Sequence, residues 1–442
     1  MQTKRDRETI EMTLLPPLET FIPEDHYLRC LDRVLDLRFV HEAVRERYCQ
    51  NNGRPSIDPE VVVRLFLLQA MEGIAHVREL MRQVQVNLAY RWFIGYNLDE
   101  KLPDHSTLSK ALDRFGDELF NELFERSIAK CRNSGLIEGK VLHVDATTIR
   151  ADLDRNRVGG SDSPDSDARF GRFPDGKLRP GYKQHTIADG ANRVVLGVAV
   201  TSAERPEHDQ AIALMDEVLE RLKRPPQTLC GDSAYASGRN YDELRDRGVR
   251  LVSPPPQAKT YTGDQYFSVE DFEYDEEGDV FVCPAGRVLK QIYTEKKRGR
   301  RIYRALRSDC RDCELKLHCT KTDARQVKVS AHHAGLVKLR AESKTESFKQ
   351  LYASRAPSIE GVFAEAKQWH SLGRAWRRGL SKMRVQCLLI ATVMNFKRVA
   401  TLYWSLLARL WGPKTAISVI SGLIRDIWPQ TTVSSQPKPE LI

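Results

Sequence analysis

The sequence predicts an α+β protein, in which a mixed sheet with flanking helices follows an all-helical N-terminal domain. From residue 141 to residue 252, short apolar segments and amphipathic segments succeed one another in the order strand, strand, strand, helix, strand, helix, strand. That order is typical of a mixed sheet covered by helices. From about residue 25 to residue 136, apolar residues instead recur at three- and four-residue spacing, as on one face of an α-helix.

The composition is that of an ordinary folded protein. The 442 residues allow two or three domains, and 41% of them are hydrophobic. Lys and Arg (69) exceed Asp and Glu (60), and the resulting net charge of +9 favours a polyanionic partner without proving one. The N-terminus has no signal-peptide core, and the longest apolar stretch, Val385 to Phe396, is too short to span a bilayer. We therefore expect a cytoplasmic protein with reduced thiols and no membrane anchor.

Helix boundaries can be read in the N-terminal region. Asp58-Pro59 and Ser106-Thr107 are typical helix starts, and Gly135 is a typical stop. Basic and aromatic residues in this region could form a DNA-facing surface, or they could be a solvated helix face above a packed aromatic core. Composition alone favours the second interpretation. The residues concerned are Arg78, Arg82, Tyr90, Arg91, Trp92 and Phe93.

The first predicted strand, Val141–Arg150, contains one acid in an otherwise apolar pattern. Val141, Leu142, Val144 and Ile149 favour a buried strand. A carboxylate such as Asp145 costs several kcal/mol to desolvate beside a sheet core unless it is hydrogen-bonded or binds a cation. The alternative is a strand-end Asp that bonds to a neighbouring turn.

A polar loop and a strand pair follow. Residues 151–180 are rich in Asp, Ser, Gly and Arg and predict a long loop. Two strands, 182–188 and 193–201, then flank a turn, and an amphipathic helix spans 208–219. Lys183 and His185 lie on the first of these strands, where they could contact DNA phosphate or keep an edge strand soluble.

A second acid and a third complete a candidate metal site. Residues 228–235 form a short strand that ends in Asp232, and a helix beginning near Pro357 carries Glu360. Two strand-end aspartates and a helix glutamate can converge on a pair of divalent cations, and such hard oxygen ligands suit Mg²⁺. Two ions roughly 3.5–4 Å apart can activate a water or a 3′-hydroxyl and stabilise the leaving oxygen of a phosphodiester.

An insertion between Pro256 and Tyr352 is rich in cysteine. Cys310-Arg-Asp-Cys313 has the spacing of a metal-binding knuckle, and Cys283 and Cys319 supply two further thiolates for tetrahedral zinc. His318 could replace one of these ligands. Disulfides are disfavoured in the cytoplasm, so the alternative to a zinc site is four unliganded thiols.

The segment after Glu360 combines tryptophans with cations. Aromatic faces with interleaved guanidiniums can stack unpaired bases and grip phosphates near a cleaved end. The cations that we assign to this role are Lys367, Arg374, Arg377 and Arg378. The long apolar-faced helical region from Val385 to Trp411 is predicted to close the catalytic core, and the tail after Pro413 is predicted to be loosely ordered.

Taken together, these motifs resemble the DDE transposases of bacterial insertion sequences, in the branch with a ribonuclease H-like catalytic domain. The matching segments are His143–Thr147, Gly181–His185, Gly231–Tyr235 and Tyr352–Lys367. The last segment resembles the family's Tyr, Arg, Glu, Lys signature, carried here by Tyr352, Arg355, Glu360 and Lys367. Four residues separate Arg355 from Glu360, whereas the family pattern usually has three.

The resemblance implies the roles of these residues. Asp145, Asp232 and Glu360 would hold two Mg²⁺ or Mn²⁺ ions in a ribonuclease H-like mixed sheet. Tyr352, Arg355 and Lys367 would handle the DNA backbone and a displaced base. The partners implied are double-stranded DNA, as terminal inverted repeats and as target, and a second copy of the chain in a synaptic homodimer. The protein would be bacterial and nucleoid-associated.

These inferences give a domain map and a function. Residues 1–136 form the helical DNA-binding domain, residues 137–256 and 346–412 the catalytic domain, 257–345 the Cys-rich insertion and 413–442 the tail. The predicted function is cleavage at insertion-sequence ends and transfer of the 3′-hydroxyl into target DNA. The alternatives are a metal-dependent nuclease that does not join strands, an inactive or domesticated DNA-binding protein, and a zinc-stabilised interaction protein.

Overall fold

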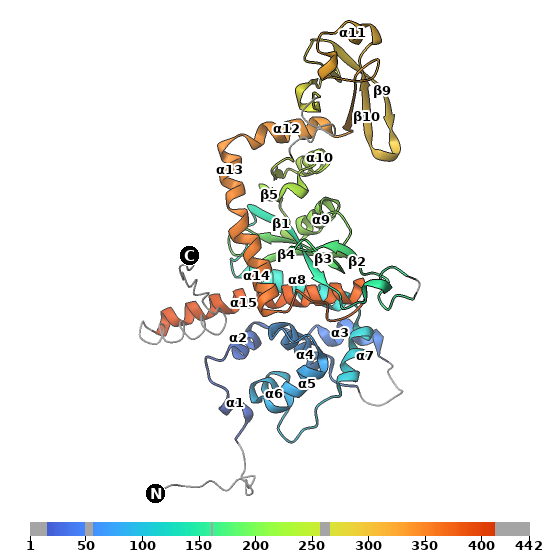
Figure 1. The fold of residues 1–442 in the computed structure, drawn as a ribbon. Coiled ribbons are helices and arrows are strands. Elements are labelled where there is room, and N and C mark those ends of the chain that lie inside the picture. The colour runs from blue at the N-terminus through green and yellow to red at the C-terminus, as the bar shows by residue number, and fades with distance from the viewer. Residues whose placement is uncertain (1–15, 49–55, 161, 257–265, 412–442) are drawn as a thin grey trace, which may run out of the picture. The chain divides into compact units, whose positions relative to one another are not determined.

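The computed structural model describes residues 16–48, 56–160, 162–256 and 266–411, and Figure 1 shows their elements. Their contacts divide the chain into two compact units. The helical unit joins residues up to 136 to residues from 366 onward, and the sheet unit comprises residues 137–365. The predicted tail, 413–442, lies outside the described residues.

Helices of the first unit begin where the sequence supplies caps. The Asp58 carboxylate accepts the Glu60 N–H at 2.7 Å, and Pro59 is the first residue of α4. Asp104 caps α7 in the same way through Ser106, and Gly135 takes a left-handed φ of 72° just after α8. The helices are α1 (Leu18–Phe21), α2 (Tyr27–Val34), α3 (Val40–Val44), α4 (Pro59–Met71), α5 (Val77–Val86), α6 (Leu88–Ile94), α7 (His105–Phe115), α8 (Glu118–Asn133) and α15 (Leu380–Trp411).

The long helix α15 packs on α8, α4 and α2 of the helical unit. A buried polar contact fixes it, since the Asn395 amide donates to the Ser127 hydroxyl at 3.2 Å. We predicted that this region would close the catalytic core, but in the structure it packs on helices of the helical unit. The sequence of an apolar helix face does not specify which elements cover it. The predicted length was also too short: Leu380–Ser405 is long and apolar enough to cross a membrane, yet 78% of its most apolar window is buried within the protein, as in a core helix.

The sheet unit is built on six strands in a ribonuclease H-like order. The path is β2-β3-β1-β5-β6, with β4 also paired to β3. Strands β1, β3 and β4 are antiparallel neighbours, whereas β1, β5 and β6 run parallel. The predicted mixed sheet with flanking helices is therefore confirmed. The elements are β1 (Val141–Arg150), β2 (Arg169–Arg172), β3 (Leu178–Asp189), β4 (Val195–Ser202), α9 (Ala211–Leu222), β5 (Thr228–Cys230), α10 (Gly238–Asp246) and β6 (Arg250–Val252).

One predicted loop contains a strand. Within residues 151–180, β2 pairs with the start of β3 in the register Arg169↔Gly181 to Arg172↔Leu178. The strand is short and polar and has only one partner, so its sequence lacks the apolar alternation that identifies longer strands. Helix α9 packs on β4 and β3, and α10 packs on β6.

The Cys-rich insertion folds into its own antiparallel sheet of five strands, ordered β11-β10-β9-β8-β7. Its small core centres on Phe281, Leu289 and Tyr303, with the rings of Phe281 and Tyr303 4.9 Å apart at their centroids. The elements are β7 (Glu273–Asp275), β8 (Val280–Val282), β9 (Val288–Glu295), β10 (Arg300–Arg304), α11 (Arg307–Arg311), β11 (Gln326–Ser330), α12 (His333–Ser343) and α13 (Glu346–Ala353).

A π-helical turn precedes the last helix of the sheet unit. Residues Ala356–Glu360 form this turn, and α14 (Gly361–Trp369) continues from it. A π-turn accommodates one residue more than an α-turn does. The π-turn therefore accounts for the fourth residue between Arg355 and Glu360, where the family pattern has three. The extra residue is taken up within the turn, and α14 follows without a break.

A glycine allows β1 and β3 to approach each other, and this generates a testable prediction. A Cβ on Gly181 would lie 2.2 Å from the carbonyl oxygen of Ile149, which is backbone and cannot rotate away. We expect Gly181→Ala to destabilise this strand pair by about 2 kcal/mol. The measurement is amide hydrogen exchange of peptides covering β1 and β3.

Gly160→Ala is the matched control, since a Cβ there meets nothing within 4 Å. Equal exchange protection in the two variants would show that the close approach at Gly181 does not hold the strands.

Candidate active site

The sheet register brings two aspartates to one place. In the parallel pair β1–β5, His143 lies opposite Cys230. Asp145 and Asp232 each follow two residues later in the same direction, so they emerge side by side where β5 ends. Leu142 and Val144, which lie on one face of β1, are buried. A slip of one residue would expose them, so their burial fixes the register.

Each aspartate is held by its own local contacts. The Asp145 carboxylate accepts the Ala146 N–H at 2.8 Å and the Arg355 guanidinium at 2.7 Å. Asp232 accepts the Ala234 N–H at 3.0 Å, as the cap of a short 3₁₀ turn. The Asp232 carbonyl also accepts the hydroxyl of Ser253, which follows β6. Both carboxylates are therefore oriented before any ligand arrives.

A third acid, which the sequence analysis did not single out, joins them. One carboxylate oxygen from each of Asp145, Glu207 and Asp232 lies within 4.8 Å of the others. Glu207 stands in the turn between β4 and α9, and its side chain is 24% exposed. The sequence signal is weak there, because Glu204 and Asp209 occupy the same turn and nothing in the pattern distinguishes the three.

Glu360 is placed differently from the two aspartates. Its side chain is 66% exposed, and its carboxylate lies 3.9 Å from the guanidinium of Arg355. Arg355 itself is buried and pairs with Asp145. The structure thus connects Glu360 to Asp145 through a shared cation. In this conformation Glu360 is not one of the three acids whose oxygens lie within 4.8 Å of one another.

Burial dominates the electrostatics of the site. It raises the pKa of Asp145 to about 6, with Asp232 and Glu207 adding to the rise, although Arg355 and the Ala146 N–H oppose it. Burial also lowers the pKa of His143 to about 4, so that this ring is neutral near pH 7. The pKa of the buried Tyr235 hydroxyl lies well above its ordinary value, through burial and then through Glu207, Asp145 and Asp232.

The two residues predicted to contact DNA from β3 have protein partners. The Lys183 ammonium lies 3.0 Å from the Glu207 carboxylate and donates to the Arg205 carbonyl at 3.0 Å. His185 has no exposed surface, and its ring meets the Thr201 hydroxyl at 2.9 Å. In this conformation Lys183 anchors the turn that carries Glu207, and His185 packs inside the sheet. Their contact with DNA stays a prediction.

The other predicted DNA-binding residues are distributed over both units. Tyr352 is half-buried on α13, and Lys367 lies on α14. In the helical unit, the Arg377 guanidinium stacks 5.4 Å from the ring centroid of Phe66, and burial lowers its pKa to about 10. Arg374 and Arg378 are exposed. Arg377 is therefore partly buried against Phe66, whereas the other two side chains are exposed and accessible to a phosphate.

The four cysteines of the insertion gather around its core. Cys283, Cys310 and Cys319 pack against the cluster that contains Phe281. Burial raises the pKa of Cys319, as do the three other thiols, although Arg325 opposes the rise. The Cys283 sulfur accepts a hydrogen bond from the Arg287 N–H at 3.3 Å. None of the four forms a disulfide.

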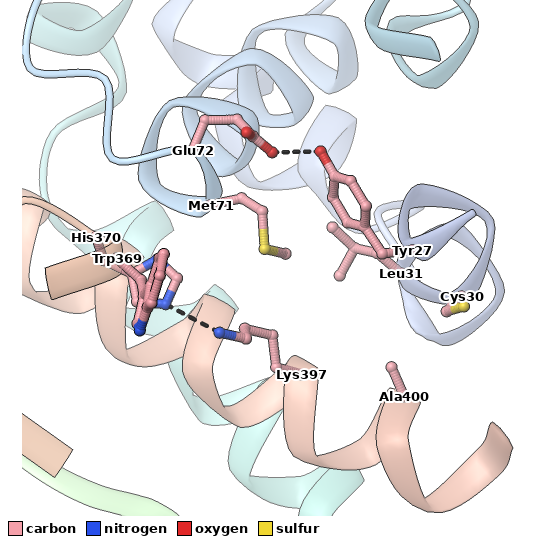
Figure 2. A pocket seen from close by; sticks show the side chains of 9 residues that line it. All are labelled: Tyr27, Cys30, Leu31, Met71, Glu72, Trp369, His370, Lys397 and Ala400. Carbon is pink, nitrogen blue, oxygen red and sulfur yellow. Dashed lines mark hydrogen bonds between the residues drawn. The ribbon is translucent and has the colours of Figure 1, made fainter. Parts of the chain in front are cut away.

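The helical unit contains a cavity of about 260 Å³, which Figure 2 shows from close by. Glu72 accepts a hydrogen bond from Tyr27, and the Lys397 ammonium lies 3.4 Å from the His370 ring. The lining residues are Tyr27, Cys30, Leu31, Met71, Glu72, Trp369, His370, Lys397 and Ala400. A single carboxylate among nine residues does not make a site for a pair of divalent cations, so this cavity is not the metal centre.

Two family models match separate stretches of the chain. Residues 16–114 match the family described as a transposase domain (DUF772), and residues 282–400 match the family described as a transposase DDE domain. The predicted resemblance to DDE transposases is confirmed. The DDE match spans the cysteines and Glu360, whereas Asp145 and Asp232 lie outside it and are placed by the sheet geometry alone.

Solved structures show a more distant likeness. A synaptic complex of piggyBac transposase with hairpin DNA is 11% identical with a TM-score of 0.34, covering 92% of this chain and 86% of that chain. A paired-end complex of Mos1 transposase is 14% identical with a TM-score of 0.17, covering 46% and 61%. Because these scores are low, the site is interpreted from the chain's own residues. The comparison with curated proteins gives no match.

The raised pKa of Asp145 predicts how metal binding depends on pH. A proton and a cation compete for the same carboxylate, and in the metal-free protein the proton wins as the pH falls through about 6. We expect Mn²⁺ affinity to be nearly constant from pH 7.5 to 6.5 and to fall about tenfold per pH unit below the pKa. Calorimetric titration of DNA-free protein with Mn²⁺ at several pH values measures this.

Asp145→Asn is the control, because its residual Mn²⁺ affinity should show no inflection near pH 6. A wild-type affinity that stays flat down to pH 5 would contradict an Asp145 carboxylate with a raised pKa.

Proposed function

We propose that this DDE transposase domain cleaves DNA at the ends of an insertion sequence and joins the freed 3′-hydroxyl to target DNA. The observation that carries the proposal is the pair of aspartates, Asp145 and Asp232, that the parallel strands β1 and β5 bring together in one acidic group. Carboxylates in such a group would be unfavourable in a structural role, because nearby like charges repel and burial adds a desolvation cost.

The residues present fit Mg²⁺ or Mn²⁺. Asp145 and Asp232 would hold the ion, with Glu360 as the third acid that the family resemblance implies, and all three offer hard oxygen ligands. When bound, the metal supplies Lewis-acid activation of the attacking oxygen and neutralises charge on the phosphodiester. The chain's own contribution is orientation: the Ala146 and Ala234 N–H groups fix the two carboxylates, and Arg355 holds Asp145 close to Glu360.

Double-stranded DNA is the proposed partner, through terminal repeats bound by the N-terminal helices and through the catalytic site. The support is the net charge of +9 together with the transposase domain matched at residues 16–114. We also propose that two copies of the chain act together, because two element ends are cut and joined and the family resemblance implies a synaptic homodimer.

Substituting one aspartate tests this function. Asp232→Asn keeps the size of the side chain and its hydrogen bond to Ala234 while it removes the charge that a cation needs. Cleavage of an end-containing duplex should fall to background, while the affinity for that duplex in a gel-shift assay stays within about twofold of wild type, within the few tenths of a kcal/mol usual for surface changes. Cleavage by the Asn variant at the wild-type rate would refute the metal assignment.

A precleaved end separates transposase from nuclease. Wild-type protein given a duplex with a free 3′-hydroxyl should produce joined product with target DNA. Cutting of intact ends without any joining would favour the nuclease that does not transfer strands. Binding of DNA with neither reaction would favour the inactive DNA-binding protein.

We also propose a structural zinc ion in the insertion, held by Cys283, Cys310, Cys313 and Cys319. The supports are the backbone N–H that donates to the Cys283 sulfur and the effect of the three other thiols on the pKa of Cys319, which a dication would relieve. Purified protein should contain about one zinc per chain by elemental analysis, and Cys310→Ser should lose it.

The control is Cys131→Ala, in the helical unit, which should keep its zinc. Zinc content that is unchanged in Cys310→Ser would contradict this assignment.

A further inference from the structure

Contacts with β3 and β4 hold Glu207 close to the two aspartates. Glu207 immediately precedes the 3₁₀ turn His208–Gln210, which leads into α9, and α9 packs on β4 and β3. Lys183, on β3, fastens the turn twice: its ammonium donates to the Arg205 carbonyl and pairs with the Glu207 carboxylate, both at 3.0 Å. The result is an acid with a defined position whose oxygen lies within 4.8 Å of both aspartates.

This grouping of like charges is unfavourable by itself. Like charges this close together repel one another, and partial burial strengthens the repulsion. In the described part of the chain, the three acids have ion pairs with two cations, Arg355 at Asp145 and Lys183 at Glu207. A dication among the three oxygens would relieve the remaining repulsion.

Tyr235 supplies a second and independent indication of a ligand. Its side chain is fully buried, and its hydroxyl has no hydrogen-bond partner among the described residues. The groups that act most strongly on the pKa of this hydroxyl after burial are Glu207, Asp145 and Asp232, so the hydroxyl lies near the acidic group. A buried hydroxyl without a partner is unfavourable, and a water or phosphate oxygen carried by a bound cation would satisfy it.

We propose that Glu207 is a metal ligand of this active site, so that Asp145, Asp232 and Glu207 hold a divalent cation before DNA binds. The inference rests on the proposed metal-dependent function and adds a fourth acid to it. Glu360, which is exposed and next to Arg355, then belongs to the DNA-bound stage. In the DNA-free protein, the third acid of the metal site is Glu207.

The competing explanation is structural: Glu207 could serve only to pair with Lys183. The two roles make different predictions for Lys183→Gln. If Glu207 is a ligand, this substitution removes a contact that positions the carboxylate but keeps the carboxylate itself, so Mn²⁺ affinity falls much less than in Glu207→Gln. If the ion pair is the whole role, Lys183→Gln should weaken Mn²⁺ binding as much as Glu207→Gln does.

The experiment is Mn²⁺ binding to DNA-free full-length protein, measured by electron paramagnetic resonance at pH 7.5. Mn²⁺ prefers oxygen ligands, so the cysteines of the insertion do not compete for it. Glu207→Gln should weaken binding at least tenfold, and Glu207→Asp should recover part of the loss. Glu204→Gln is the matched control from the same turn, where the side chain is exposed, and it should bind like wild type. Thermal unfolding of each variant checks that it is folded.

The outcomes separate this inference from the proposed function. If Asp232→Asn loses Mn²⁺ but Glu207→Gln binds it like wild type, the metal site stands and Glu207 is not a ligand. If Asp232→Asn binds Mn²⁺ as tightly as wild type, the metal site itself is wrong, and the inference falls with it. Equal weakening in Lys183→Gln and Glu207→Gln overturns the ligand role in favour of the ion pair. Should Glu207→Gln fail to fold, Glu207→Asp compared with Glu204→Asp decides in its place.

Discussion

The parallel pairing of β1 with β5 is the constraint on which the site depends. It brings the Asp145 and Asp232 carboxylates together beside the C-terminal end of β5, where burial raises the pKa of Asp145 to about 6. The free energy gained by burying apolar side chains of the strands must outweigh the cost of burying a carboxylate near other acids. Leu142, Val144 and Leu229 contribute to that gain, because their side chains are almost completely buried. The Asp232 cap belongs to the same arrangement, because the hydrogen bond that its carboxylate accepts from the Ala234 N–H fixes the backbone beside this acid.

Much of the sheet unit was predictable because its strands carry strong local signals. The segment Val141–Arg150 was predicted with the bounds that the structure shows, and Asp232 was placed correctly after β5. The apolar pattern of a central strand and the Gly231-Asp232 break are local features that pairing does not alter. By contrast, β2 has a short polar sequence, and α15 has an apolar face that several partners could cover.

Glu207 shows what the sequence could not supply. Its position depends on Lys183, twenty-four residues earlier, and on the packing of α9 against β4, neither of which leaves a pattern in its own turn. Arg355 was predicted as a DNA contact, and the structure adds an ion pair with Asp145 that spacing alone does not reveal. Contacts between side chains that tertiary packing brings together could therefore not be predicted from the sequence, whereas the positions of residues in or directly after strands could.

The positions of the four acids suggest a division of labour. Asp145, Asp232 and Glu207 are mostly shielded and are fixed by contacts from the sheet unit, so they are preorganised to hold charge without reorganisation. Glu360 ends a π-turn, a feature often found at functional sites, and its exposed carboxylate lies 3.9 Å from the Arg355 guanidinium. A DNA phosphate that drew Arg355 away would release Glu360 toward the cation that, in our proposal, the other three acids hold before DNA binds. Because one guanidinium pairs with both acids, DNA contact and completion of the catalytic site would become a single event.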